Sequence, residues 1–148
     1  MHRRPPLRSF LLIVVALAGC SSAVKVQPFE GSDTPVCREV ADSWPVTVGG
    51  QPSRETAVQT RGVAAWGDPA IIARCGAPVP GPTTDQCLDV EGVDWVADQL
   101  EDGVAFTTYG RDPAIEVLVP DAYEPEPLVL PAFGAAAQVV PQGDGRCS

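Results

Sequence analysis

The chain has 148 residues and a formal net charge of −9, with 19 acidic residues, 10 basic residues and a single histidine, His2. Nucleic acids and anionic lipid headgroups are bound through lysine and arginine, so this charge balance excludes them as favoured partners. The length suits one domain that buries a moderate core.

The first 19 residues resemble the signal peptide of a bacterial lipoprotein. Arginines precede an apolar run over residues 10–18, which is too short to remain as a membrane-spanning helix. The run ends in Leu17-Ala18-Gly19-Cys20, which resembles the lipobox, the motif that is cleaved just before its cysteine and lipidated on that cysteine. We therefore predict a lipid at Cys20 that anchors the protein on the extracytoplasmic face of the cell membrane. An ordinary secretory signal with a chance cysteine is the alternative.

Four cysteines lie beyond the signal: Cys37, Cys75, Cys87 and Cys147. An even number in an exported protein favours two disulfides, and three pairings are possible. We favour Cys75–Cys87, which brackets a loop rich in proline and glycine, together with Cys37–Cys147, which ties the two ends of the chain. A metal site is disfavoured because no C-x-x-C spacing occurs and His2 is lost with the signal. No cofactor is expected.

The polar, unpatterned residues 20–33 are expected to form a tether between the lipid and the folded body. Thr34 can cap a helix whose first position is Pro35 and which Pro45 stops. The expected apolar face of this helix recurs every four residues, at Val36, Val40 and Trp44.

Strands are expected at residues 56–66, 70–75, 87–96, 104–109 and 114–119. The last two are the clearest, because they are rich in β-branched and aromatic residues and flank the turn sequence Gly110-Arg111-Asp112-Pro113. Residues 76–86 hold several prolines and are expected to form a loop. A final apolar helix is expected from about Leu130 to Val140. The residues that face the sheet from it are expected to be Phe133, Ala137 and Val140.

Together these elements predict a single α+β domain over residues 34–148. Its sheet is expected to be small and mostly antiparallel, with four or five strands. The N- and C-terminal helices are expected on one face of this sheet, and two disulfides are expected to staple the fold.

Three motifs resemble an actinobacterial family of secreted proteins and lipoproteins of unknown function, numbered 3515. They are Ala65 to Gly76 (AWGDPAIIARCG), Gly92 to Trp95 (GVDW) and Phe106 to Arg111 (FTTYGR). The resemblance extends from about Val36 to the end of the chain. It implies an envelope location and supplies no reaction, ligand or catalytic residue.

The sequence limits the chemistry that the protein can perform. No histidine remains after the signal and the cysteines are expected to pair, so Ser-His-Asp and Cys-His sites are excluded. A carboxylate pair of the glycosidase type is the remaining catalytic option. The aspartates near predicted strand ends or loops are Asp68, Asp85, Asp89, Asp94 and Asp112. Solvated surface carboxylates are the simpler interpretation of all five.

Arginine and aromatic residues offer a second option, a platform for an anion or a sugar. The residues concerned are Trp66, Arg74, Trp95, Tyr109 and Arg111. Tryptophans buried in the core beside an internal arginine ion pair would produce the same pattern. We assign no catalytic residue, and take Arg74, Tyr109 and Arg111 as the candidate ligand-binding residues.

We therefore expect an anchored envelope lipoprotein that acts as a non-enzymatic binding or assembly module. Its partners would be the membrane, through the lipid at Cys20, and an unidentified envelope protein or ligand. A carboxylate-dependent hydrolase acting on envelope glycan or peptide and a receptor for a small anionic ligand are the alternatives.

Overall fold

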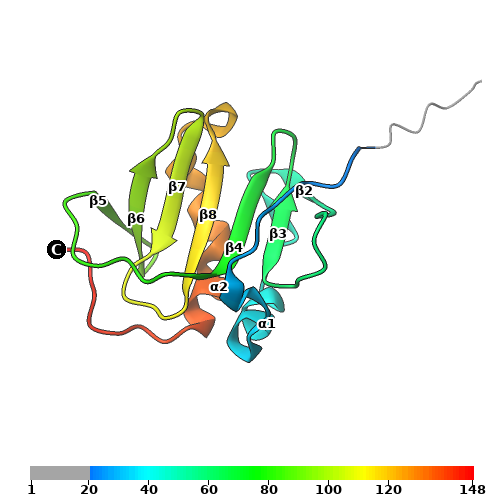
Figure 1. Ribbon diagram of the computed structural model, residues 1–148. Coiled ribbons are helices and arrows are strands. Elements are labelled where there is room, and N and C mark those ends of the chain that lie inside the picture. The colour runs from blue at the N-terminus through cyan, green and yellow to red at the C-terminus, as the bar shows by residue number, and fades with distance from the viewer. Residues whose placement is uncertain (1–20) are drawn as a thin grey trace, which may run out of the picture.

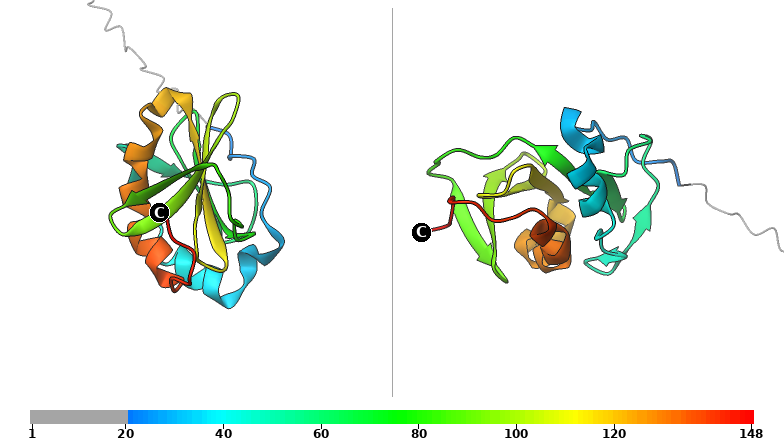
Figure 2. Two further views of the ribbon diagram at one scale, coloured as in Figure 1. Left: turned by 90° about the vertical axis from the view of Figure 1, so that its left-hand side faces the viewer. Right: turned by 90° about the horizontal axis from the view of Figure 1, so that it is seen from below.

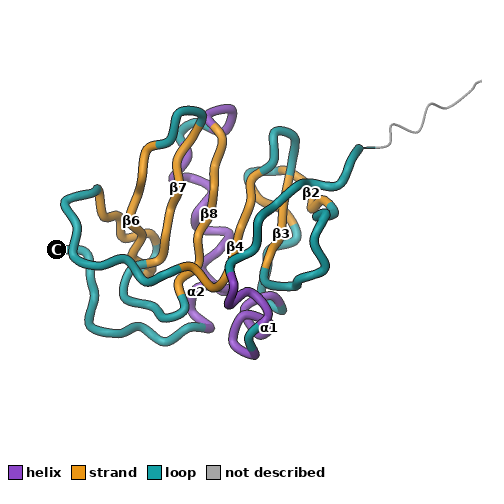
Figure 3. Tube along the Cα trace, viewed as in Figure 1, coloured by secondary structure: helices purple, strands orange, loops and turns teal. Residues whose placement is uncertain are grey.

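The structure is a computed structural model that describes residues 21–148. The predicted signal peptide, residues 1–19, and Cys20 lie outside the described residues. Eight strands form one antiparallel sheet in the order β1-β2-β3-β4-β8-β7-β6-β5 (Figure 1). The expectation of a four- or five-stranded sheet in an α+β fold is therefore wrong. Strands dominate the described chain, and its two α-helices are short (Figure 3).

The strands are β1 (Thr47–Val48), β2 (Gln51–Arg54), β3 (Val63–Trp66), β4 (Ile71–Ala77), β5 (Gln86–Val90), β6 (Val93–Gln99), β7 (Gly103–Thr108) and β8 (Ala114–Pro120). The helices are α1 (Pro35–Ala41) and α2 (Gly134–Val139), with 3-10 helices η1 (Glu30–Asp33), η2 (Asp121–Tyr123) and η3 (Glu126–Phe133). No helix among residues 21–148 has both the length and the apolar character that a membrane span requires.

The sheet has more strands than expected for two reasons: β1 and β2 form in residues for which no strand was predicted, and one predicted strand is a hairpin. Residues 87–96 divide into β5 and β6 at Glu91-Gly92, where both residues have positive φ, 53° and 83°. Such a two-residue turn matches the twist of antiparallel strands. The backbone N–H of Gly92 donates to Asp89 Oδ1 at 3.0 Å and closes the turn. A glutamate at positive φ is uncommon, which is why the sequence pattern hid this reversal.

Helices η3 and α2 cover one face of the sheet, and the N-terminal segment lies on the opposite face (Figure 2). Of the residues expected to face the sheet from the last helix, Phe133 and Ala137 are fully buried and Val140 is 1% exposed. Trp66 of β3 meets the Phe133 ring edge-on, with ring centroids 5.4 Å apart. The favourable edge-to-face geometry places aromatic packing at the centre of the core.

Residues 21–33 differ from the free tether that their composition suggests. Val24 pairs with Thr56 through a parallel bridge, and the backbone N–H of Val24 donates to the Glu55 carbonyl at 2.8 Å. Ser32 is 2% exposed, and its hydroxyl donates to the Cys75 carbonyl at 2.8 Å. Backbone and hydroxyl groups make these contacts, so the segment lies against the sheet without the apolar pattern that would have revealed it.

The described chain contains two disulfides, Cys37–Cys75 and Cys87–Cys147, so the expected number is confirmed and the favoured pairing is wrong. The sheet register explains the difference. Cross-strand partners share a face of the sheet, and one such row runs through Arg74, Glu116, Thr107, Val96 and Cys87. Cys75 follows Arg74 in β4 and points to the opposite face, toward α1. Cys75 and Cys87 therefore cannot meet.

Candidate functional site

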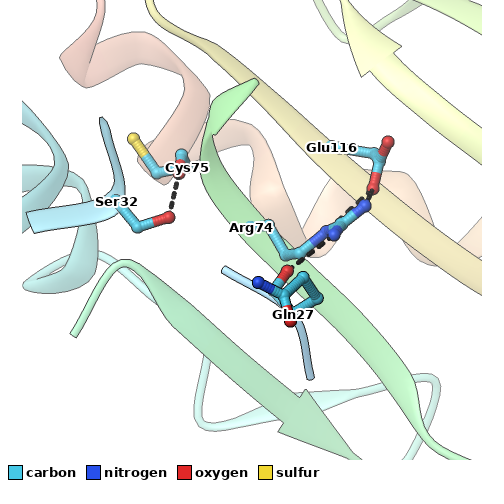
Figure 4. Close-up of polar contacts among 5 residues, drawn as sticks. All are labelled: Gln27, Ser32, Arg74, Cys75 and Glu116. Atoms are coloured by element: carbon cyan, nitrogen blue, oxygen red, sulfur yellow. Dashed lines mark hydrogen bonds and ion pairs between the residues drawn. The ribbon is translucent and has the colours of Figure 1, made fainter. Parts of the chain in front are cut away.

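Arg74 lies in the middle of the sheet and is held by internal partners (Figure 4). Its guanidinium forms an ion pair with Glu116 of β8, with Nε 3.0 Å from Oε1, and Nη1 donates to the Gln27 carbonyl at 2.7 Å. The Phe29 ring lies over the guanidinium, 4.2 Å from the ring centroid to Cζ. Arg74 therefore fastens the N-terminal segment to the sheet.

Tyr109 and Arg111 contact the other end of the chain. Arg111 is 6% exposed, and its Nη1 donates to the Val140 carbonyl. The Gln142 side-chain amide donates to the Tyr109 carbonyl at 3.2 Å. Burial is the main cause that lowers the pKa of Arg111, and the like charge of Arg146 lowers it further, whereas Asp94 raises it. This pair therefore holds the C-terminal segment, separately from the contacts of Arg74.

The two candidate tryptophans belong to the core. Trp66 is 1% exposed and Trp95 is fully buried. The Trp66 indole N–H donates to the Pro45 carbonyl at 3.0 Å. Neither ring is available to stack on a ligand, so the core interpretation of the tryptophans is the one that the structure supports.

The candidate aspartates occupy different surroundings. Asp89 and Asp94 are cross-strand partners in β5 and β6, yet each carboxylate accepts a backbone N–H, from Gly92 and Cys147 respectively, at 3.0 Å. Asp68 is 90% exposed beside Arg54, at 3.7 Å. Asp89 therefore stabilises a turn and Asp94 holds a chain end, whereas Asp68 is a solvated surface carboxylate.

The two remaining aspartates line separate cavities. Asp85 contributes to one of about 440 Å³ together with Asp98 and Glu126, two acids that the sequence analysis did not single out. Asp85 and Asp98 are exposed to solvent. Two of the three carboxylates in this cavity are therefore solvated surface groups. Asp112 belongs to a different cavity.

That cavity is a groove of about 590 Å³ between η1, the start of α1, the end of β4 and the β7–β8 turn. We call it the η1 groove. Its apolar lining is formed by Phe29, Val36, Ala77, Pro78, Val79 and Pro113. Glu30 and Asp112 are the charged residues of its lining, and both are exposed.

A close backbone approach shapes the η1 groove. Gly76 has φ of +99°, and a Cβ atom built on it would lie 2.8 Å from the carbonyl carbon of Gly31. Only glycine accommodates both the positive φ and this contact. Sequence reasoning missed the groove because its walls come from distant segments, although the prolines at 78 and 113 mark two of its walls.

Comparison with known proteins identifies a family but no activity. A family model described as a protein of unknown function, DUF3515, matches residues 10–142, which is most of the chain. No curated protein and no solved structure shows significant similarity. The chain belongs to the DUF3515 family, as the three sequence motifs predicted.

Proposed function

We propose that this DUF3515 protein is a non-enzymatic binding module, anchored by a lipid at Cys20 on the extracytoplasmic face of the cell membrane. Its site would be the η1 groove, and its ligand an apolar peptide segment that carries a basic residue and belongs to an envelope partner. The groove itself carries the proposal. Its volume of about 590 Å³ lies within the range of about 300–1,000 Å³ found for binding sites.

The composition of the groove indicates the ligand. Six apolar side chains line it, so an apolar group that enters would leave water and gain contact area. The carboxylates of Glu30 and Asp112 stand beside this apolar surface, where a lysine or arginine of the ligand would form charge-assisted hydrogen bonds. Valine, leucine or proline next to a basic residue is the sequence type that combines both properties.

The charge of the chain also argues against an anionic ligand. All 19 acidic residues lie beyond the predicted signal, whereas three of the ten basic residues, Arg3, Arg4 and Arg8, lie within it. Arg74 is paired with Glu116, and Arg111 is buried against the Val140 carbonyl. Neither guanidinium presents the open fork that binds a carboxylate or phosphate.

The docked N-terminal segment would hold the module close to the bilayer. The Ser22 carbonyl accepts a hydrogen bond from Arg54 Nη2 at 2.8 Å, and Val24 pairs with Thr56. Two residues of extended chain reach at most about 7 Å. A lipid at Cys20 would therefore keep the domain against the membrane surface instead of on a long, loose tether.

Site-specific photocrosslinking in the producing cell tests the groove. A photoreactive phenylalanine analogue replaces Val79, which lines the groove and is 41% exposed, or Val46, which is 83% exposed and outside it. We expect a defined adduct from position 79 only, and its peptide should be apolar with a basic residue. Combining Glu30→Gln with Asp112→Asn should reduce the adduct severalfold. Equal adducts from both positions, or no effect of neutralisation, would overturn the proposed site.

The anchor is tested separately with Cys20→Ala. This variant should leave the membrane fraction or remain unprocessed, because its lipid attachment atom is gone. A processed variant that stays equally membrane-bound would contradict lipid anchoring at Cys20. Crosslinking from position 79 in this variant shows whether groove binding depends on the anchor.

A further inference from the structure

The two disulfides lie in very different surroundings. Cys37 and Cys75 are both fully buried, and the Ser32 hydroxyl donates to the Cys75 carbonyl beside them. Cys87 and Cys147 are partly exposed, and both line a cavity of about 140 Å³. A reagent that attacks a disulfide sulfur needs access to it. Only the second disulfide offers that access in the folded protein.

The cavity at Cys87–Cys147 also has a suitable charge. Arg146 lines it and is exposed, and it forms no ion pair among the described residues. A guanidinium beside a disulfide attracts an incoming thiolate and stabilises the thiolate that leaves. Seven of the residues that the structure describes are basic, and Arg146 is one of the exposed ones.

We propose that Cys87–Cys147 is a thiol–disulfide exchange site for a dithiol partner, such as a protein with a C-x-x-C pair, and that Cys37–Cys75 is a permanent structural bridge. The partner's thiolate bonds to Cys147 Sγ, and the disulfide electron pair leaves on Cys87 Sγ. The partner's second thiol loses its proton to water and attacks the mixed disulfide, which releases Cys147 as a thiolate. The partner ends as a disulfide, and the cysteine pair has gained two electrons.

Exchange at this site would release the C-terminal strap, which we define as residues 141–148. Apart from the disulfide, hydrogen bonds hold the strap to the sheet. The Gly143 N–H donates to the Gly110 carbonyl at 2.6 Å, and the Cys147 N–H donates to Asp94 Oδ2 at 3.0 Å. The Gln142 side-chain amide also donates to the Tyr109 carbonyl at 3.2 Å, and Gln142 pairs with Arg111 through a single bridge. A few hydrogen bonds near a chain end open more readily than the ladder of a sheet. The strap would therefore detach while the sheet stays folded.

Limited reduction of the oxidised protein tests the proposal. The protein from residue 20 onward is treated with a low concentration of dithiothreitol under native conditions, alkylated with iodoacetamide and mapped by mass spectrometry. Cys87 and Cys147 should be alkylated at least about tenfold faster than Cys37 and Cys75, because reduction of the buried Cys37–Cys75 bridge requires an opening of the core. Equal rates, or earlier loss of Cys37–Cys75, would overturn the assignment.

Two further measurements separate an exchange site from a merely exposed bridge. Arg146→Gln should slow reduction about two- to fivefold, the size of a surface charge effect. Lys25→Gln, which removes an exposed cation on the N-terminal segment, should leave the rate unchanged, and equal rates for both variants would overturn the role of Arg146.

After selective reduction, hydrogen exchange should rise at the Gly143 and Cys147 amides only. Loss of protection throughout β7 and β8 would show instead that this bridge is needed for folding.

Discussion

Gly62→Ala tests whether the N-terminal segment is part of the fold. A Cβ atom built on Gly62 would lie 2.1 Å from the Ser32 carbonyl oxygen and 2.9 Å from its carbonyl carbon. Both are backbone atoms, so no side-chain rotation relieves the clash. Ser32 is buried and hydrogen-bonded to Cys75, so alanine at position 62 must push η1 away from β3.

The cost follows from two contributions. Overpacking a closely packed site costs about 1–3 kcal/mol, and losing the Ser32–Cys75 hydrogen bond costs about 0.5–1.5 kcal/mol. We therefore expect the free energy of unfolding to fall by about 2–4 kcal/mol. At about 3–6 °C per kcal/mol for a domain of this size, the melting temperature should fall by about 6–24 °C.

Thermal unfolding of the oxidised protein, followed by circular dichroism, measures this effect. Gly134→Ala is the matched control, because a Cβ at position 134 has no neighbour within 4 Å and its φ is not positive. Alanine at this first position of α2 should leave the melting temperature unchanged or raise it slightly. If Gly62→Ala also melts within about 2 °C of the natural protein, η1 is not packed on β3 and residues 21–33 are a free tether.

Two other substitutions probe groups that the fold has buried or paired. Arg111→Ala should lower the free energy of unfolding by about 1.5–3 kcal/mol in urea titrations, because the charged hydrogen bond to the Val140 carbonyl is lost, and unchanged stability would contradict the clamp. Burial, followed by the charge of Asp68, raises the pKa of Tyr123, whose hydroxyl donates to the Pro69 carbonyl at 2.6 Å. The folded pKa lies above the unfolded value of about 10, so this stabilisation is complete below pH 10 and is lost as the pH rises through the folded pKa. Tyr123→Phe should therefore lose less stability than the natural protein between pH 9 and 11, and parallel losses would refute this reasoning.

Several features of the fold follow from local sequence alone. Proline at position 35 begins α1, as predicted, because its missing N–H and restricted φ suit the first position of a helix. The β-branched runs on either side of the 110–113 turn form β7 and β8. The apolar spacing of Phe133, Ala137 and Val140 placed these residues in the core. In each case, neighbours within a few positions supply the necessary information.

Helix α1 shows where local information stops. It ends at Ala41, before the predicted stop at Pro45, and the Thr34 hydroxyl donates to the Gly31 carbonyl at 2.8 Å instead of accepting an N–H of the helix. The preceding turn η1 competes for the hydroxyl. Trp44 nevertheless packs edge-on against Phe133, with ring centroids 6.4 Å apart.

Only the tertiary structure decided the disulfide pairing, the docking of residues 21–33 and the η1 groove. Cys75 and Cys87 are close in sequence, but the register of five strands places them on opposite faces of the sheet. The N-terminal segment is held by backbone carbonyls, the Ser32 hydroxyl and the Phe29 ring over Arg74, which form no periodic pattern in the sequence. The groove joins residues near positions 30, 77 and 112, which meet only once the sheet has formed. Strand register and backbone hydrogen bonding depend on partners distant in the chain, so side-chain pattern alone does not encode them.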